Sequence, residues 1–131
     1  MKKIKIIAEI AQGYEGDINL CKKFIKLAKK SGADGVKFQI FEADELCIED
    51  YVHYDLFKSL YIPPNEWVGI IKECSSIGLE FYADIFGVKS LRWMLENNVS
   101  GIKIHSSDLK NHELLNELKN RNIIIPSRNE N

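Results

Sequence analysis

A chain of 131 residues with 45% hydrophobic content is large and apolar enough to bury the core of one domain. Its 18 Lys and Arg against 19 Asp and Glu give a formal net charge of -1, which argues against nucleic acid or an anionic membrane as a partner. Three widely spaced cysteines without a CxxC pair argue against a disulfide framework or a zinc site, and they indicate a reducing, cytoplasmic compartment.

Short apolar segments of β type alternate with longer segments of helical period along the chain. This alternation is typical of parallel strands joined by crossover helices. The expected strands cover residues 3–10, 35–41, 79–86, 101–106 and 122–125. We expect residues 1–131 to form a single unit without a second domain, and residues 128–131 to be a frayed end.

Four helices are expected between these strands. The first should bury Leu20, Phe24, Leu27 and Ala28 and close at Gly32. The second should begin with Pro64 in its first turn, end at Gly78 and bury Trp67, Ile70, Ile71, Cys74 and Ile77. A third carries Leu91, Met94 and Leu95, and a fourth, capped by Asn111, carries Leu114, Leu115 and Leu118.

One connection, residues 42–62, is much longer than the usual link of about 2 to 6 residues. It contains the aromatic residues Tyr51, His53, Tyr54, Phe57 and Tyr61. The segment is either a lid over a substrate or a small packing cluster, and the sequence leaves both readings open.

Four β/α units followed by a strand fit a doubly wound sheet or the first half of an eight-stranded barrel. The turn after the first strand, residues 11–16, reads AQGYEG and lacks the glycine patterns that bind nucleotide phosphates. The expected fold class is therefore α/β, a parallel (β/α) barrel of TIM type, with only its first half present.

Side chains alternate between the two faces of a strand, so polar positions can be sorted by their spacing. In each of the first four expected strands, most apolar residues share one face and the polar residues share the other. If the apolar faces pack on helices, the polar side chains point into the barrel near its C-terminal mouth. They are Glu9, Lys37, Gln39, Asp84, Lys103 and His105.

Buried charges need partners, so this cluster indicates either mutual ion pairing or a charged ligand. Mutual pairing would join Glu9 to Lys37 and Asp84 to Lys103. A charged ligand is favoured because a barrel core can be built from Val, Ile and Leu alone. Two lysines beside the hydroxyls of residues 106 and 107 suit a phosphate or a carboxylate. His105 is either an acid–base group or a hydrogen-bonded structural residue.

Three segments of this sequence are similar to the N-acetylneuraminate (sialic acid) synthase family, which includes the legionaminic and pseudaminic acid synthases. They are residues 8–10 ahead of Gly16 and Asp17, the segment SGADGVKFQ at residues 31–39, and Lys103 and Ile104 followed by Ser106 and Asp108. The resemblance extends through almost the whole chain, and it implies the N-terminal half of that family's barrel.

The resemblance implies an enzyme that condenses phosphoenolpyruvate with an N-acetylated mannosamine-type sugar in surface carbohydrate biosynthesis. It further implies that Lys37, Lys103 and Ser106 hold phosphoenolpyruvate, that Gln39 helps place the sugar, and that Glu9 lies beside the reacting carbons. Asp84, His105 and Asp108 complete the expected set of substrate-binding residues. Catalysis of this kind needs cations at the anionic ends of the substrate and a carboxylate near the cationic intermediate.

The sequence also departs from the family pattern. Residues 11–14 stand where the family has Gly-Asn-Asn-His-like residues, and residues 83–86 stand where it has Ser-Thr-Pro-Phe. Asp84 thus replaces a phosphate-binding hydroxyl by a carboxylate, which would repel phosphate unless a lysine pairs with it. The family's divalent metal, manganese or magnesium, is expected to bind histidines in the later half of the barrel, so we expect no metal ligand in this chain.

As a half-barrel, the chain is expected to be inactive or nearly so by itself and to associate, most simply as a homodimer. Two rival functions stay open. One is an aldolase that forms a Schiff base through Lys37 or Lys103. The other is a degenerate half-barrel that acts as a non-catalytic binding or assembly partner.

Overall fold

The strands form one parallel sheet whose spatial order follows the chain. The computed structural model describes residues 4–119, 121, 125 and 126. The strands lie in the order β1-β2-β3-β4-β5, with the bounds β1 (Ile7–Ala11), β2 (Gly35–Ile40), β3 (Glu80–Ile85), β4 (Gly101–Ile104) and β5 (Ile125–Pro126). A doubly wound sheet reverses its strand order at a switch point, whereas a barrel wall does not. The observed order is therefore that of a barrel wall.

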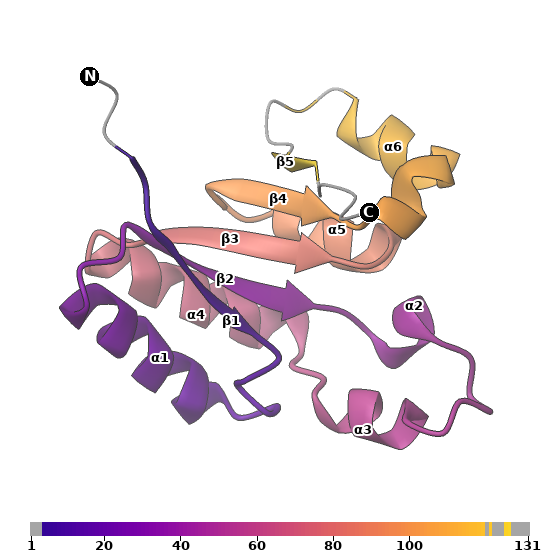
Figure 1. Ribbon diagram of the computed structural model, residues 1–131, viewed down its shortest axis with the longest axis horizontal. Coiled ribbons are helices and arrows are strands. Elements are labelled where there is room, and N and C mark those ends of the chain that lie inside the picture. The colour runs from indigo at the N-terminus through magenta and orange to yellow at the C-terminus, as the bar shows by residue number, and fades with distance from the viewer. Residues whose placement is uncertain (1–3, 120, 122–124, 127–131) are drawn as a thin grey trace.

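Helices cover one face of this sheet and bury its apolar side chains. The main helices are α1 (Ile18–Lys30), α4 (Pro64–Ser76), α5 (Val88–Leu95) and α6 (His112–Leu118), and Figure 1 shows α4 and α5 behind the strands. Alternate residues of β2, β3 and β4 enter the common core with them, namely Val36, Phe38, Ile40, Phe81, Ala83, Ile85, Ile102 and Ile104. The alternation leaves the other face of the sheet to the polar residues.

Helix α1 uses a different face from the expected one. Its buried residues are Cys21, Ile25 and Ala28. The expected face was therefore right at Ala28 and wrong at Leu27, which is 56% exposed, and Leu20 and Phe24 are only partly buried. Positions 21, 25 and 28 also follow the helical repeat, so two overlapping apolar stripes were available in the sequence. The helix begins after Asp17, whose carboxylate accepts hydrogen bonds from the backbone N–H of Asn19 and Leu20 at 2.7 and 3.3 Å.

The other expected helices are confirmed with small differences. Helix α4 begins at Pro64 and buries Trp67, Ile70, Ile71 and Cys74. The side chain of Asn111 accepts a hydrogen bond from the backbone N–H of Leu114 at 3.2 Å, which confirms the expected cap of α6. Ile77, Leu95 and Leu115 are only partly buried. No helix in the part of the chain that the structure describes is long and apolar enough to cross a membrane.

Three of the expected strands need correction or lie partly outside the described residues. The first strand begins at Ile7 rather than at residue 3, and Ile4 and Ile6, which precede it, are exposed. The fourth strand ends at Ile104 rather than at residue 106. Residues 122–124 of the expected fifth strand and the expected frayed end at 128–131 lie outside the described residues.

The long connection contains two short helices, α2 (Ala43–Leu46) and α3 (Tyr54–Ser59). Phe41, at its start, makes edge contacts with Phe57 of α3 and with Phe86, with ring centroids 6.1 and 5.5 Å apart. Tyr51 stacks on Phe57. These contacts support the packing-cluster reading of the connection, and the lid reading stays a prediction.

The turn before α1 fixes this connection against the barrel wall. Gly16 has a φ of 73°, and a Cβ added there would overlap the carbonyl oxygen of Ser59 in α3. Gly32 has a similar φ of 83°, but nothing lies within 4 Å of its added Cβ. An alanine at Gly32 therefore meets only the cost of the backbone conformation, whereas an alanine at Gly16 meets that cost and the cost of the steric overlap.

We predict that Gly32→Ala lowers the free energy of unfolding by about 1 kcal/mol, the cost of a left-handed residue with a Cβ. Gly16→Ala should cost a further ~1–3 kcal/mol because the added methyl group meets backbone that cannot move freely. Urea unfolding of both variants measures the difference. Equal losses in the two variants would contradict the contact between the turn and α3.

Candidate active site

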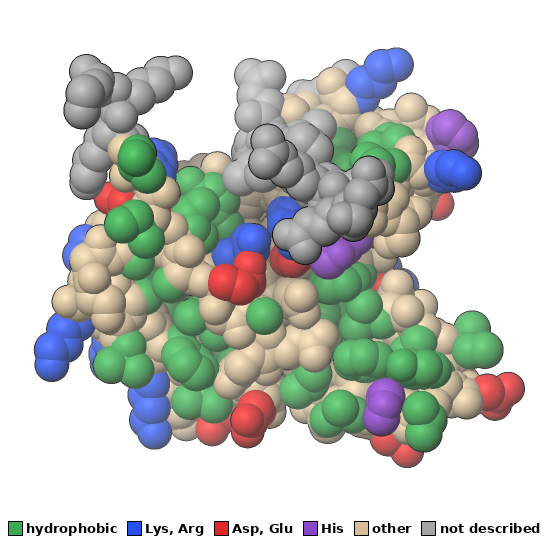
Figure 2. Space-filling model, viewed as in Figure 1, with side chains coloured by type: hydrophobic (Ala, Val, Ile, Leu, Met, Phe, Trp, Pro, Cys, Tyr) green, Lys and Arg blue, Asp and Glu red, His purple; other side chains and the backbone are tan. Residues whose placement is uncertain are grey.

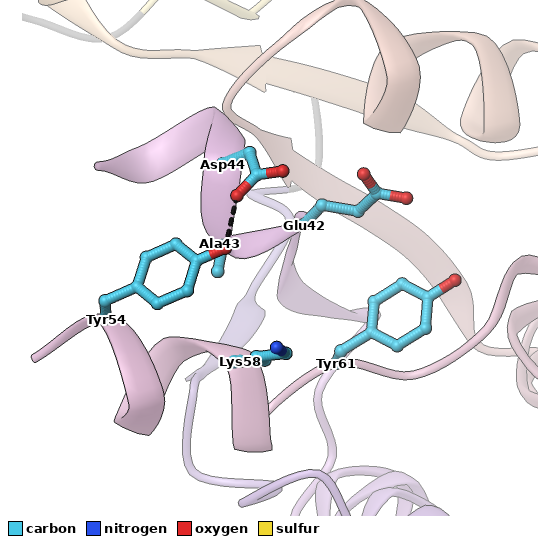
Figure 3. Close-up of a pocket in the computed structure, with 6 residues that line it drawn as sticks. All are labelled: Glu42, Ala43, Asp44, Tyr54, Lys58 and Tyr61. Atoms are coloured by element: carbon cyan, nitrogen blue, oxygen red, sulfur yellow. Dashed lines mark hydrogen bonds between the residues drawn. The ribbon is translucent and has the colours of Figure 1, made fainter. Parts of the chain in front are cut away.

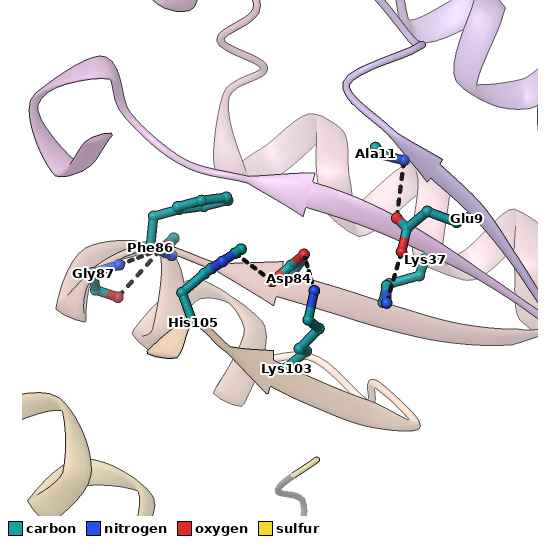
Figure 4. A network of polar contacts seen from close by, with 9 residues as sticks. Glu9, Ala11, Lys37, Asp84, Phe86, Gly87, Lys103 and His105 are labelled. Carbon is teal, nitrogen blue, oxygen red and sulfur yellow. Dashed lines mark hydrogen bonds and ion pairs between the residues drawn. The ribbon is translucent and has the colours of Figure 1, made fainter. Parts of the chain in front are cut away.

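The polar face of the sheet carries the residues that the sequence singled out. Strand register pairs Glu9 with Lys37, Gln39 with Asp84, and Asp84 with Lys103. Because residues in register on neighbouring parallel strands have side chains on the same face, these groups meet in the middle of the sheet. Figure 4 shows Glu9 and Lys37 in one group of polar contacts and Asp84, Lys103 and His105 in another, together spanning strands β1 to β4. The two groups are called the ion-paired network below.

Glu9 and Lys37 form the first ion pair, with 2.6 Å between Oε2 and Nζ. The other carboxylate oxygen of Glu9 accepts a hydrogen bond from the backbone N–H of Ala11 at 3.1 Å. Ala11 has a φ of 52°, and the β1–β2 register shifts between Glu9 and Ala11. The strained turn at the end of β1 thus holds Glu9, whose side chain is still 46% exposed.

Asp84 is the buried centre of the second group, with its side chain 1% exposed. Its Oδ2 lies 3.2 Å from Nζ of Lys103, and its Oδ1 lies 2.8 Å from Nε2 of His105. Neither Oδ1 nor Nε2 has a hydrogen bond of acceptable geometry in the described part of the chain. The contact to His105 is therefore a close approach between two polar atoms rather than a hydrogen bond.

Phe86 holds the imidazole ring of His105. Their ring centroids are 4.2 Å apart with an interplanar angle of 24°. Phe86 follows β3 and also contacts Phe41. The aromatic cluster of the long connection is therefore joined to the polar network through one ring. The sequence analysis missed this role, although Phe86 lies two residues after Asp84.

Ser106 and Asp108 lie beyond the strands, in the 3₁₀ helix η1 (Ser106–Lys110) that follows β4. Ser106 is exposed and Asp108 is partly buried. Burial raises the pKa of Asp108, an effect that His105 and a hydrogen bond from Asn111 oppose. These two residues therefore lie at the C-terminal rim, outside the ion-paired network.

Tyr14 is a second residue that the sequence analysis did not select. Its side chain is buried, and its hydroxyl donates a hydrogen bond of 2.8 Å to the backbone carbonyl of Gln39. Burial raises the pKa of this phenol. The bond ties the turn after β1 to the end of β2, which places Glu9 relative to Gln39. The mixed polar turn AQGYEG gave no clear signal for such a buried anchor.

A third polar group closes the N-terminal end of the same face. Glu80 forms an ion pair with Lys5 and accepts a hydrogen bond from the hydroxyl of Tyr82 at 2.5 Å. Lys5 and Tyr82 lower the pKa of Glu80, and burial raises the pKa of Tyr82 to about 12. The Tyr82 ring lies against Gly35, where a Cβ would come within 2.9 Å of it.

The structure bears on both interpretations of the charged cluster, mutual ion pairing and a charged ligand. Both ion pairs expected from mutual neutralisation are present. Apart from Asp84, however, their side chains are 20 to 46% exposed, and the space-filling view shows acidic, lysine and histidine side chains gathered near the middle of the surface (Figure 2). The pairs therefore neutralise each other while three of the four side chains stay partly exposed.

A separate cavity of about 420 Å³ lies between α2 and α3. It is lined by Glu42, Ala43, Asp44, Tyr54, Lys58 and Tyr61. Tyr54 donates a hydrogen bond to Asp44 at one end (Figure 3). None of the site residues expected from the sequence lines this cavity, and the chemistry of the network in Figure 4 identifies the better candidate for the active site.

The described residues do not fit a divalent metal. No three His, Cys, Asp or Glu side chains among residues 4–119, 121, 125 and 126 group closely enough to hold one. Asp84 and His105 approach each other, but the neighbouring group is the ammonium of Lys103 rather than a third ligand.

Comparison with known proteins gives consistent similarities. The model of the NeuB family matches residues 24–127. The N,N'-diacetyllegionaminic acid synthase of Legionella pneumophila is 31% identical over 120 residues, which cover 81% of this chain and 34% of that protein. The N-acetylneuraminate-9-phosphate synthase of Drosophila melanogaster is 29% identical over 133 residues, which cover 92% of this chain and 36% of that protein.

A solved structure shows the same fold. It is the N-acetylneuraminic acid (sialic acid) synthetase of Leptospira borgpetersenii in complex with citrate, with a TM-score of 0.90 and 27% identity. The match covers 99% of this chain and 46% of that chain. It confirms the expected fold class, since the sheet corresponds to the N-terminal part of a TIM-type barrel. The chain spans about a third of the length of the curated relatives it matches.

We predict that Tyr14→Phe lowers the free energy of unfolding by about 1 kcal/mol at neutral pH through loss of one hydrogen bond. The phenol ionises near its ordinary pKa of 10.0 in the unfolded chain but at higher pH in the folded chain. Its contribution to stability is therefore complete below pH 10 and is lost as the pH rises further.

Urea unfolding between pH 8 and pH 11 tests this second point. The stability of Tyr14→Phe should decline less steeply above pH 10 than that of the unchanged chain. Other groups contribute to the decline in both proteins, so the difference between the two curves isolates Tyr14. Parallel curves would show that the phenol is not buried in the folded chain.

Proposed function

Because the chain belongs to the NeuB family of sialic and related nonulosonic acid synthases in carbohydrate biosynthesis, we propose that it forms the phosphoenolpyruvate-binding wall of such an enzyme. The proposed reaction joins phosphoenolpyruvate to an N-acetylated mannosamine-type sugar and releases phosphate. The observation that carries the proposal is the convergence of two lysines and two carboxylates from four adjacent strands on one accessible face.

Each residue has a proposed role that fits its position. Lys37 and Lys103 supply the cations that hold the anionic ends of phosphoenolpyruvate, with the exposed hydroxyl of Ser106 at the rim. Gln39 lies in register with Asp84 and is proposed to place the sugar. Asp108, on the rim helix, is proposed to contact the sugar end of the site.

Glu9 is the proposed catalytic residue. Attack of the methylene carbon of phosphoenolpyruvate on the sugar aldehyde forms the new carbon–carbon bond and leaves a positive charge on the adjacent carbon, which bears the phosphate. Water then adds to this carbon, and the resulting tetrahedral intermediate loses phosphate. The aldehyde oxygen becomes a hydroxyl by taking up the proton that the attacking water gives up. A carboxylate fixed by Lys37 and by the backbone N–H of Ala11 is placed to stabilise that cation and to orient the water.

The divalent metal that the resemblance implies is proposed to be held by residues of the later half of the barrel, so no residue of this chain is assigned to it. The described residues do not form a divalent-metal site, and each role above belongs to a side chain of the described chain.

We also propose a cytoplasmic location, which fits three cysteines that are all free. Small molecules are the proposed ligands, and neither nucleic acid nor a membrane is a proposed partner.

The Schiff-base aldolase requires a neutral, desolvated amine, whereas both lysines here form ion pairs with carboxylates. Borohydride treatment with pyruvate tests this rival directly, because a stable adduct on Lys37 or Lys103 would support it. The non-catalytic half-barrel is tested by ligand binding, since it predicts no specific affinity for phosphoenolpyruvate.

We predict that the chain binds phosphoenolpyruvate and that Lys37→Ala or Lys103→Ala weakens binding by about 10- to 100-fold, because each removes a charge-assisted contact worth roughly 1.5–3 kcal/mol. Isothermal titration calorimetry measures the affinities. Lys23→Ala is the matched control, since Lys23 is exposed on α1. Lys58→Ala tests the separate cavity between α2 and α3.

If only Lys58→Ala weakened binding, the ligand would belong to that cavity and the proposed site would be wrong. Activity is tested by release of phosphate from phosphoenolpyruvate with an N-acetylhexosamine. Release that Lys37→Ala abolishes would rule out the non-catalytic reading.

We further propose that the isolated chain forms a homodimer. Strand β1 lies at an edge of the sheet, the neighbouring Ile4 and Ile6 are exposed, and unpaired strand edges favour association. Light scattering across a range of concentrations is expected to show a dimer. A monomer that persists at high concentration would contradict this prediction.

A further inference from the structure

The ion-paired network has no net charge unless His105 is protonated. Glu9 and Lys37 cancel, and Asp84 and Lys103 cancel. A site with balanced charges attracts a dianion only weakly, because each lysine already interacts with a carboxylate. His105 is the remaining ionisable group in direct contact with this network in the described part of the chain.

The geometry shows what protonation of the ring would change. Nε2 of His105 lies 2.8 Å from the buried Oδ1 of Asp84, yet neither atom is hydrogen-bonded. A neutral ring gains little from that contact, whereas an imidazolium gains the attraction of a full charge. Phe86 keeps the ring in place by stacking on it. The side chain of His105 is 27% exposed, so an approaching ligand can reach it.

The charged groups around the ring come from three elements. Asp84 lies on β3, Lys103 lies on β4, and Asp108 lies on η1, where its pKa responds to His105. Both carboxylates would attract a positively charged ring, and the ammonium of Lys103 would repel it. A bound dianion adds two further negative charges near the ring and shifts this balance toward the imidazolium.

We propose that His105, as an imidazolium, is the third cation of the anion-binding site, so that the chain takes up a proton when it binds a phosphate-like dianion. The inference rests on the proposed function because it concerns the same site. In this arrangement Asp84 neutralises Lys103 in the empty site, and His105 restores the positive charge when the ligand arrives. His105 is then a ligand-binding residue, and Asp84 sets the charge of the empty site through its ion pair with Lys103.

Sulfate is the probe for this proposal, because it stays a dianion over the whole pH range of the test and cannot itself supply the proton. Since binding favours the protonated ring, the affinity must rise as the pH falls. One coupled proton gives at most about a tenfold change per pH unit. We expect affinity for sulfate to be about tenfold higher at pH 6 than at pH 8 at constant ionic strength. Titration calorimetry in two buffers of different ionisation enthalpy should show uptake of up to one proton.

Two variants separate this role from a structural one. His105→Asn should bind sulfate at pH 6 no more tightly than the unchanged chain does at pH 8, and without proton uptake. Asp84→Asn removes the neutralising carboxylate, so its affinity at pH 8 should rise about tenfold, the size expected for one gained unit of charge near a partly exposed ligand. Circular dichroism checks that each variant folds, and His105→Gln replaces His105→Asn if that variant does not.

The outcomes distinguish the inference from the proposed function. Sulfate binding that depends on Lys103 but is the same at pH 6 and pH 8, without proton uptake, would overturn the role of His105 and leave the anion site in place. Failure of the unchanged chain to bind sulfate or phosphoenolpyruvate at either pH would overturn both. Weaker binding in Asp84→Asn at pH 8 would contradict the charge balance on which the inference depends.

Discussion

The buried carboxylate of Asp84 is the constraint on which the polar face depends. A charge removed from water costs several kcal/mol unless other groups compensate it, and Asp84 is almost fully buried in the middle of the sheet. Lys103 from the next strand supplies that compensation, and His105 at the end of that strand lies 2.8 Å from the same carboxylate. The register between β3 and β4 therefore has to bring these side chains together, because a shift of one residue would turn them to opposite faces.

The same alternation produces the core and the site. Every second residue of β2, β3 and β4 packs against the helices, and the residues between them form the charged network. Phe41, at the start of the connection after β2, contacts Phe86, which follows β3. Phe86 in turn stacks on the ring of His105, so the aromatic cluster of the connection is joined to the site. The site and the longest connection are thus one packed structure, and membership of the NeuB family gives this arrangement a chemical context.

Much of this architecture follows from sequence periodicity. Strand phase predicted which side chains share the polar face, and Pro64 and Asn111 located the starts of α4 and α6. The buried face of α1 was not predictable in the same way, because Leu27 and Ile25 fit two overlapping stripes and only the sheet decides between them. The hydrogen bond of Tyr14 to the backbone carbonyl of Gln39 and the stacking of Phe86 on His105 join segments that are distant in the sequence, so no local sequence pattern predicts them.

The packing of α1 on α4 also determines how the thiols react. Cys21 and Cys74 lie fully buried on these two helices, and burial raises the pKa of both to about 12. At neutral pH almost no thiolate is present at either position, so both are poor nucleophiles. Cys47, at the end of α2, is only partly buried. A maleimide dye would therefore attach preferentially to Cys47 without any engineered substitution, and its fluorescence would report directly on the environment of the long connection.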